Sequence, residues 1–455
     1  MPATNGHTSG ETEAPLNRAD EVKDLLTSIQ DLIIPFIASA DEDATVKRSG
    51  HGLRVEGGGP RTTLVEHHPP KKLECLLQKT LEISDDPSGK EGLVSLVETI
   101  LKYSVNTWDQ GFLDKLYGTS NSTAIVIARN TLYPETKVSG HGSLKLTIFT
   151  SAHGHYSVEK AANLHGLGTS NVISVPVDNN GQIVPEDFAR LVQESKARGE
   201  TPFFLNATAG TTVHGSFDPF TPLSTICKQH NMWLHIDGSW GGPVIFSAPH
   251  ASSRLAGAHL ADSITINPHK MLGVPMTSSF LLGADMAHFH AALTLPAGYL
   301  FHNAPAAGAE HIYDLADLTP QCGRRADALK FFLALQYYGA AYFGHLVATG
   351  FANAEYLLAK LKESGSFVTI SPEPLPCLQV CFYYAREGKL EGDAEKNSKV
   401  TADIANRLIS RGFMIDYAPG EKGRFFRVVV NGGTRTGTLD GLVKALVETA
   451  AELGY

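Results

Sequence analysis

A single lysine, Lys270, follows the sequence Asn-Pro-His and precedes a small and apolar run. The β-rich stretch 263–266 predicts a strand, which the pair Asn267-Pro268 ends by turning the chain. An amine at a strand exit with poorly hydrated neighbours can lose its proton near neutral pH and attack a carbonyl. Lys270 is therefore a candidate nucleophile, although this stretch alone favours a lysine on an ordinary surface turn.

Other predicted strand ends carry groups that would complete such a site. Asp237 ends the apolar run WLHID, His153 and His155 follow a second run, and FFLNATAGTT ends a third with small and hydroxyl residues. A buried carboxylate is costly unless it meets a positive partner. Pyridoxal phosphate needs this set: an amine for its aldehyde, a carboxylate for its ring nitrogen, a flat group against the ring, and donors for its phosphate. The sequence therefore predicts pyridoxal 5'-phosphate as cofactor.

The elements that must place these residues follow from the pattern between about residues 144 and 282. Short apolar runs alternate there with helical stretches, as in a mostly parallel sheet covered by helices. The predicted strands are 144–149, 172–177, 202–206, 232–237, 263–266 and 278–282.

The two ends of the chain have different patterns. Apolar residues at helical spacing from Val22 to Ile37 predict an amphipathic helix. Near the C-terminus, CLQVCFYY, a helix over 399–411, RFFRVVV and a last helix from Leu439 predict a small α+β unit. We predict a disordered tail (1–16), an N-terminal helical segment (17–105), a large cofactor-binding domain (106–340) and a small C-terminal domain (341–455).

Composition bounds the remaining possibilities. The chain has 455 residues, of which 42% are hydrophobic and 19% charged, as in globular proteins. Its net charge of −9 argues against nucleic-acid binding, and no apolar run is long enough to cross a membrane. Five scattered cysteines suggest reduced thiols, so we expect a cytoplasmic protein without a metal site.

Six stretches together resemble the group II pyridoxal-phosphate-dependent decarboxylases, in the branch of glutamate decarboxylase and cysteine sulfinate decarboxylase. They are HYSVEKAA, PFFLNATAGTTVHGSFDP, WLHIDGSWGG, NPHKMLGVPMTSSFLL, AGYLF and QCGRRAD, and they follow the family's order. The resemblance implies an α/β protein of fold type I, with a large, mostly parallel sheet domain and a small C-terminal domain. It also implies a homodimer with active sites at the subunit interface.

The resemblance assigns roles to the three strand-end residues. Lys270 matches the lysine that binds the cofactor covalently, Asp237 matches the partner of the pyridine nitrogen, and His155 matches the imidazole stacked on the ring.

Further matches concern the cofactor and the substrate. Thr208 lies where the family has a residue near the cofactor ring, and Asn267 and His269 flank the lysine as contacts of cofactor or substrate. Arg427, in RFFRVVV, matches the arginine that reads a substrate carboxylate. Without the resemblance, Arg427 would be interpreted as a surface arginine on a strand edge.

The chain departs from the family pattern near residue 118. Several dozen residues that the family carries, including a Gly-Gly-(Ser/Ala) phosphate loop, are missing where Gly118 joins Thr119. The remaining GTSNST opens a predicted helix, whose Thr119, Ser120 and Ser122 hydroxyls can hold a phosphate. We therefore expect Ser120 to contact the cofactor, and we expect cofactor affinity to be weak.

A second departure lies after AGYLF, in a loop where the family places an aromatic residue near the leaving carboxylate. The one tyrosine in the segment HNAPAAGAEHIYDLADL is Tyr313, which we take as the candidate catalytic residue of this loop.

The expected function is that of a lyase in amino acid metabolism. It would convert an L-amino acid to its amine, with acidic substrates (glutamate, aspartate or cysteine sulfinate) first and aromatic ones second. Two alternatives stay open, namely a degenerate, weakly or non-catalytic family member and an aldehyde-forming oxidative decarboxylase-deaminase.

Overall fold

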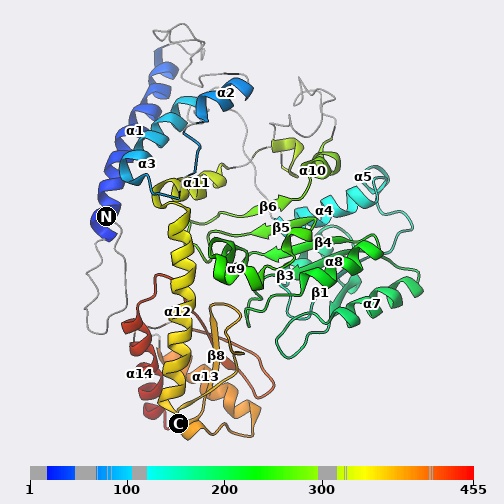
Figure 1. The fold of residues 1–455 in the computed structure, drawn as a ribbon, viewed down its shortest axis with the longest axis vertical. Coiled ribbons are helices and arrows are strands. Elements are labelled where there is room, and N and C mark those ends of the chain that lie inside the picture. The colour runs from blue at the N-terminus through cyan, green and yellow to red at the C-terminus, as the bar shows by residue number, and fades with distance from the viewer. Residues whose placement is uncertain are drawn as a thin grey trace. The chain divides into compact units, whose positions relative to one another are not determined.

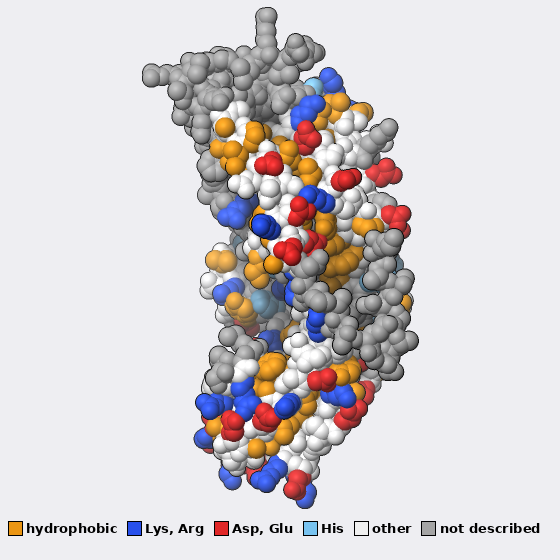
Figure 2. Space-filling view, turned by 90° about the vertical axis from the view of Figure 1, so that its left-hand side faces the viewer, with side chains coloured by type: hydrophobic (Ala, Val, Ile, Leu, Met, Phe, Trp, Pro, Cys, Tyr) orange, Lys and Arg blue, Asp and Glu red, His pale blue; other side chains and the backbone are white. Residues whose placement is uncertain are grey.

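The computed structural model describes residues 18–46, 68, 70–78, 80–83, 85–104, 120–295, 315–321, 323, 325–408, 411, 413 and 415–455. The chain forms two compact units, residues 1–83 with 87–114 and residues 84–86 with 115–455. None of the helices in these described ranges is both long and apolar enough to span a membrane. On the face drawn in Figure 2, acidic and basic side chains are interspersed.

The first unit contains three helices, α1 (Arg18–Val46), α2 (Pro70–Leu77) and α3 (Gly89–Tyr103). The predicted helix over 22–37 is present and extends beyond both predicted ends. An ion pair of 2.7 Å between Lys90 Nζ and Asp24 Oδ1 links α3 to α1.

A six-stranded sheet dominates the second unit (Figure 1). Its order is β2-β1-β3-β4-β5-β6, and every neighbouring pair is parallel except β5 with β6. The strands are β1 (Leu146–Ser151), β2 (Val172–Val175), β3 (Thr201–Thr208), β4 (Trp233–Gly238), β5 (Ser263–Ile266) and β6 (Phe280–Gly283). All six predicted strands are present, with bounds shifted by at most a few residues.

The predicted strand at 278–282 starts later than expected. His269 Nδ1 donates to the Ser278 carbonyl and Ser279 Oγ donates to Asn267 Oδ1, so these two serines contact the turn around Lys270 instead of extending β6. The shift therefore has a local cause at the candidate site.

Helices cover both faces of this sheet, because alternate side chains of its strands enter two different cores. Ile148 and Phe204 pack with α4 (Ser120–Leu132), α6 (Ser157–Leu164) and α10 (Met286–Leu293). Phe149 and Leu205 pack with α7 (Pro185–Ala197), α8 (Phe220–Gln229) and the start of α12 (Ala340–Ser364). Further helices of this unit are α5 (Thr136–Ser139), α9 (Ala248–Arg254) and α11 (Asp327–Tyr338).

A small antiparallel sheet, ordered β7-β8-β10-β9, follows α12. Its strands are β7 (Phe367–Thr369), β8 (Gln379–Tyr384), β9 (Asp416–Ala418) and β10 (Phe425–Val429), with α13 (Ala394–Leu408) and α14 (Thr436–Glu452) packed on it. The helix predicted over 399–411 begins earlier, because the Asp393 carboxylate accepts a hydrogen bond of 2.9 Å from Glu395 N and so caps Ala394.

The long helix α12 joins the two sheets (Figure 1). Its first part enters the core beneath the large sheet through Phe343, Val347 and Phe351, and its second part enters the core of the small sheet through Leu357 and Leu361. The predicted domain boundary at residue 340 falls where this helix begins.

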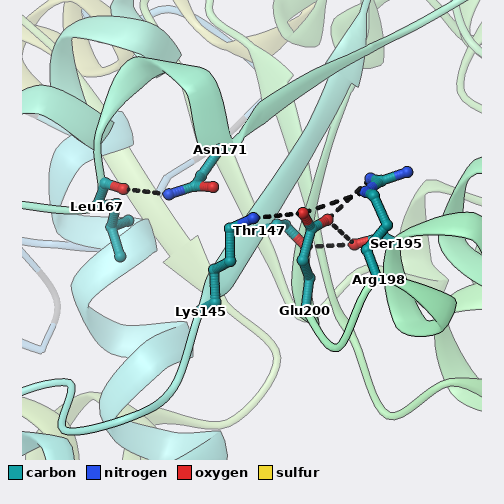
Figure 3. Close-up of polar contacts among 7 residues, drawn as sticks. All are labelled: Lys145, Thr147, Leu167, Asn171, Ser195, Arg198 and Glu200. Atoms are coloured by element: carbon teal, nitrogen blue, oxygen red, sulfur yellow. Dashed lines mark hydrogen bonds and ion pairs between the residues drawn. The ribbon is translucent and has the colours of Figure 1, made fainter.

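The edge of the large sheet where β3 begins carries a polar network, drawn in Figure 3. The Glu200 carboxylate accepts hydrogen bonds from Lys145 Nζ (2.7 Å), Arg198 (2.8 Å) and Ser195 Oγ (2.8 Å). Ser195 Oγ also lies 3.1 Å from Thr147 Oγ1 in β1. The donors from Arg198 and Lys145 lower the pKa of Glu200 to about 2.

Candidate active site

The opposite edge of the large sheet, where the parallel strands end, surrounds a cavity of about 410 Å³. Ligands of open α/β sheets bind at this edge. The cavity brings together six of the residues predicted from the sequence, which are His155, Thr208, Asp237, Asn267, His269 and Lys270.

Lys270 lies in the turn that follows β5. Its backbone N–H donates to the Asn267 carbonyl (3.0 Å), and the buried side chains of Met271, Leu272 and Val274 anchor the turn in the core. The Lys270 side chain is exposed because it faces the cavity, yet the surrounding protein removes enough water to lower the pKa of its amine. The negative charge of Asp237 opposes this shift only in part.

Asp237 closes β4 and is 5% exposed. Burial disfavours its charge, but Ser239 N (3.0 Å) and Asn121 Nδ2 (2.8 Å) donate to the two carboxylate oxygens. These donors, with His235, outweigh burial and hold the pKa of Asp237 below its usual range. A deeply buried carboxylate is thus kept ionised by neutral hydrogen-bond donors.

His235 lies two residues earlier on the same face of β4. Its Nδ1 lies 2.8 Å from Ser263 Oγ and its Nε2 lies 3.3 Å from Thr265 Oγ1. Burial lowers the pKa of His235 to about 4, so the imidazole is neutral at neutral pH. Asp237 therefore has no full positive charge from this neighbour.

His155 reaches the cavity from the loop between β1 and α6. Ser157 N donates to its Nδ1 at 3.3 Å. Burial lowers the pKa of His155, and the nearby Asp237 offsets this only partly. The ring is a flat, neutral surface at neutral pH.

The remaining predicted cofactor contacts differ in how well they are paired. Thr208 Oγ1 is buried and has no hydrogen-bond partner in the described part of the chain, although its backbone N–H donates to Asp218 Oδ2 (2.7 Å). Asn267 Oδ1 accepts from Ser279 Oγ (2.6 Å), and His269 Nδ1 donates to the Ser278 carbonyl (2.5 Å).

Three predicted site residues are not brought into this cavity by the described structure. Arg427 does not line it: the guanidinium pairs with Asp416 and donates to the carbonyl of Thr212 (2.9 Å), which is a lining residue. Tyr313 and the side chain of Ser120 lie outside the described residues. Their predicted roles stay predictions.

The Ser122 hydroxyl, which we expect to be able to hold a phosphate, already has one contact within the protein. Ser122 lines the cavity, but its Oγ lies 2.6 Å from His165 Nε2 on the next helix end. The hydroxyl is engaged in this contact because α4 and α6 pack side by side.

Asn121 is a site residue that the sequence interpretation did not include. Its Nδ2 donates to Asp237 and also to Ser157 Oγ (3.1 Å), while its Oδ1 is buried without a partner among the described residues. The sequence could have indicated Asn121, because it lies in GTSNST at a predicted helix start. A side-chain amide at such a position can face the cavity as readily as a hydroxyl can.

The donor set fits pyridoxal phosphate. The cavity wall offers an amine with a lowered pKa (Lys270), an ionised buried carboxylate (Asp237) and a neutral imidazole (His155). The unpaired buried oxygens of Thr208 and Asn121 add polar contacts that a bound ring could satisfy.

The similarity of this chain to known proteins also indicates a pyridoxal-phosphate site. Residues 120–385 match the family described as "Pyridoxal-dependent decarboxylase conserved domain". An L-aspartate decarboxylase of Metarhizium robertsii is 43% identical over 496 residues, covering 96% of this chain and 98% of the relative. Because that alignment exceeds 455 residues, the relative carries residues without a counterpart here. A glutamate decarboxylase-like protein of Gibberella zeae is 36% identical, covering 73% and 71%.

Solved structures give the same result for the fold. Mouse CSAD matches with a TM-score of 0.68 at 27% identity, covering 95% of this chain and 99% of that chain. Oryza sativa TDC with PLP and tryptamine also has a TM-score of 0.68, at 18% identity, covering 97% and 100%. The predicted fold class, enzyme class and cofactor are thereby confirmed, and this chain belongs to the group II pyridoxal-phosphate-dependent decarboxylases.

Proposed function

We propose that this enzyme decarboxylates an acidic L-amino acid, with L-aspartate as the first candidate and glutamate and cysteine sulfinate next. The convergence of Lys270, Asp237 and His155 on one cavity is the observation that carries the chemistry. The substrate class is supported by the 43% identity with an L-aspartate decarboxylase over nearly the full length of both chains.

Lys270 is proposed to hold the cofactor. When bound, pyridoxal phosphate supplies an aldehyde for an amine and an electron-withdrawing ring that accepts the electrons left by carbon dioxide. Desolvation favours the neutral Lys270 amine, which is the nucleophilic form. After decarboxylation, the same amine can hold or deliver a proton within the cavity.

Asp237 is proposed to keep a proton on the ring nitrogen. Its charge is buried, and its donors Ser239 N and Asn121 Nδ2 are neutral, so its negative charge is available to a cationic ligand group. Asn121 and Ser239 fix the carboxylate oxygens, which orients the charge before the ligand arrives.

Other wall residues are proposed to orient the ligand and exclude water. The neutral ring of His155 can stack against a flat cofactor, and Thr208 Oγ1, which has no partner among the described residues, can form a hydrogen bond to it. Asn267, His269 and Ser120 are proposed as further cofactor contacts, and Tyr313 as the residue near the leaving carboxylate. Arg427 would bind a substrate carboxylate only by exchanging its contact with Asp416.

We also propose that the enzyme acts as a cytoplasmic homodimer. Support for a dimer comes from the family resemblance and from the apolar side chains Val22, Leu26 and Ile34 on α1, each more than half exposed in the single chain. Sedimentation of the purified protein at several concentrations tests this part.

The test of function is a substrate panel. Purified protein is loaded with pyridoxal phosphate and incubated with aspartate, glutamate, cysteine sulfinate and an aromatic amino acid, while released carbon dioxide is trapped and the organic product identified. Carbon dioxide and an amine from an acidic substrate are expected. An aldehyde product would show that decarboxylation is coupled to oxidative deamination. Carbon dioxide release from the aromatic substrate alone would reject the substrate class.

A weakly catalytic enzyme is the second candidate, favoured by the engaged hydroxyl of Ser122 and by the predicted loss of the phosphate loop near Gly118. Losing two charge-assisted hydrogen bonds, at roughly 1.5–3 kcal/mol each, would weaken cofactor binding by about a hundredfold or more. Cofactor titration of this chain and of a form with a grafted Gly-Gly-Ser loop tests this. Submicromolar binding by the chain as it stands would reject this candidate.

A further inference from the structure

Two histidines from different loops meet at the wall of the cavity. His153, just after β1, lines the cavity, and His214, in the loop between β3 and α8, packs against it with ring centroids 5.1 Å apart and planes tilted by 37°. His214 also packs on Phe425 of β10, with centroids 5.8 Å apart. The pair is therefore held between a cavity wall and the small sheet.

The orientation of His153 leaves one edge of its ring for a ligand. Its Nδ1 is buried without a hydrogen-bond partner among the described residues. This atom faces Gly181, where a Cβ would lie only 3.1 Å from it. Because Nδ1 is on the protein side, the ring edge that can reach the cavity is the one that carries Nε2.

The pair has no charged partner of its own. Burial lowers the pKa of His153, and burial together with the charge of His153 lowers that of His214. No carboxylate contributes to either shift. An anion at the cavity edge of His153 would reverse this balance, because it stabilises the protonated ring.

Other basic groups on the described cavity wall have contacts within the protein. The Lys160 ammonium lies 4.7 Å over the ring of Tyr156, a residue that is 58% exposed. Ser157 N donates to a ring nitrogen of His155, and His269 Nδ1 lies 2.5 Å from the Ser278 carbonyl. His153 differs from these groups because its Nδ1 is buried without a hydrogen-bond partner among the described residues, and it is therefore the candidate to bind a second anionic group of the ligand.

The loop that carries His214 is rigidly fastened. Gln379 Nε2 donates to the Thr211 carbonyl (3.0 Å), Arg427 donates to the Thr212 carbonyl (2.9 Å), and Cys381 Sγ lies 3.4 Å from the Val213 carbonyl. A wall fixed in this way loses little conformational entropy when a ligand binds.

We propose that His153 binds the distal carboxylate of the acidic substrate and that His214 is the positioning residue that holds its ring. This subsite rests on the proposed function, because only an acidic amino acid brings a second carboxylate into the cavity. It deepens that function by naming the residue that separates acidic from neutral substrates.

Binding of an unreactive dicarboxylate tests the subsite without turnover. Succinate and butyrate, which differ in the second carboxylate, are titrated by calorimetry into the pyridoxal-phosphate-loaded enzyme, its His153→Gln variant and a His230→Gln control. His230 lies at the end of α8, where its Nδ1 is 3.0 Å from Lys196 Nζ. His153→Gln should weaken succinate binding about tenfold or more and leave butyrate unchanged. Equal succinate affinity in wild type and His153→Gln overturns the proposal.

A second measurement follows the imidazole of His153 by NMR, assigned from the signal lost in His153→Gln. Succinate should raise its pKa, and butyrate should not. The variant His214→Ala removes the ring that packs on His153, so KM for aspartate should rise severalfold while kcat stays within about twofold, and His214→Phe, which keeps a ring on His153 and Phe425, should restore KM. A fall in kcat with unchanged KM would contradict the positioning role of His214.

These outcomes separate the subsite from the proposed function. If the wild type releases carbon dioxide from aspartate and His153→Gln does so with the same KM, the subsite is wrong and the function stands. If no acidic amino acid reacts but succinate binding depends on His153, the function is wrong and the subsite stands. Thermal unfolding of each variant shows whether it is folded.

Discussion

Each of the two edges of the large sheet holds a carboxylate whose pKa is lowered, but the groups around the two carboxylates differ. Glu200, at the edge where β3 begins, is paired with Lys145 and Arg198, so its charge is neutralised. Asp237, at the opposite edge, is held by two neutral donors and forms no ion pair within the described part of the chain, although its charge raises the pKa of the Lys270 amine in the same cavity. The charges around Glu200 balance one another and stabilise the fold, whereas the Asp237 carboxylate is positioned to bind a cationic group of a ligand.

Unpaired polar atoms show the same contrast. Around the cavity, Thr208 Oγ1 and Asn121 Oδ1 are buried without partners among the described residues. At the other edge, the Thr147 and Ser195 hydroxyls pair with each other, and Ser195 also donates to Glu200. Buried polar groups are normally satisfied, so a concentration of unsatisfied ones marks the edge that binds a ligand.

Lys270→Ala should have the largest effect. Without its amine, turnover should be abolished and borohydride should no longer fix the cofactor to the protein. Lys228→Ala, on the surface of α8, is the matched control and should behave as wild type. Mass spectrometry after reduction measures the adduct. A normal adduct and normal activity in Lys270→Ala would mean that another lysine anchors the cofactor.

Asp237→Asn should lose several powers of ten in kcat, at about 1.4 kcal/mol of barrier per tenfold, because an amide cannot keep the ring nitrogen protonated. A second effect of Asp237→Asn concerns the stability of the fold. Because its hydrogen-bond donors hold the pKa of Asp237 below its usual range, the ionised carboxylate stabilises the fold at neutral pH, so Asp237→Asn should also lower the free energy of unfolding. Steady-state kinetics and urea unfolding measure the two effects. Near-wild-type turnover would reject the assignment of Asp237.

Asn121→Ala removes one donor to the Asp237 carboxylate, worth roughly 1.5–3 kcal/mol, and should lower kcat about 10- to 100-fold. It should also raise the pKa of Asp237, because Asn121 helps to hold it low. The acid limb of the pH profile should therefore move to higher pH. Asn163→Ala, at an exposed position of α6, is the control. An unchanged acid limb would show that Ser239 and His235 suffice.

Local sequence patterns predicted the fold and the central residues of the site, because the end of a strand and a charged residue placed there can both be recognised in a short stretch of sequence. Lys270 and Asp237 are single charged residues at the ends of apolar runs, and Pro, Gly and Asn punctuate those runs. The Asn121–Asp237 contact joins residues 116 positions apart, and the His153–His214 pair joins two loops. Arg427 is held by Asp416 on the neighbouring strand. Such contacts depend on tertiary packing, which residue types and spacing alone do not specify.

Glu200→Gln should have the smallest effect on catalysis and a clear effect on stability. The Glu200 side chain is only 6% exposed, but Lys145 and Arg198 are 55% and 50% exposed, so solvent screens the ion pairs and the loss should be roughly 1–2 kcal/mol at pH 7. Its kcat/KM should equal that of wild type. Glu194→Gln, which removes an exposed helix-surface pair with Arg190, is the control and should cost less.

The pH dependence of that loss is the sharper part of the prediction. The folded-state pKa of Glu200 is about 2, below the ordinary value of 4.5. Its contribution is therefore fully present above about pH 4.5 and disappears as the pH falls towards 2. The difference between wild type and Glu200→Gln in urea unfolding should be constant from pH 7 to 5 and shrink below pH 4.5. A difference that does not shrink would mean that packing, and not charge, makes Glu200 stabilising, and the contrast with Asp237 would then lose its electrostatic basis.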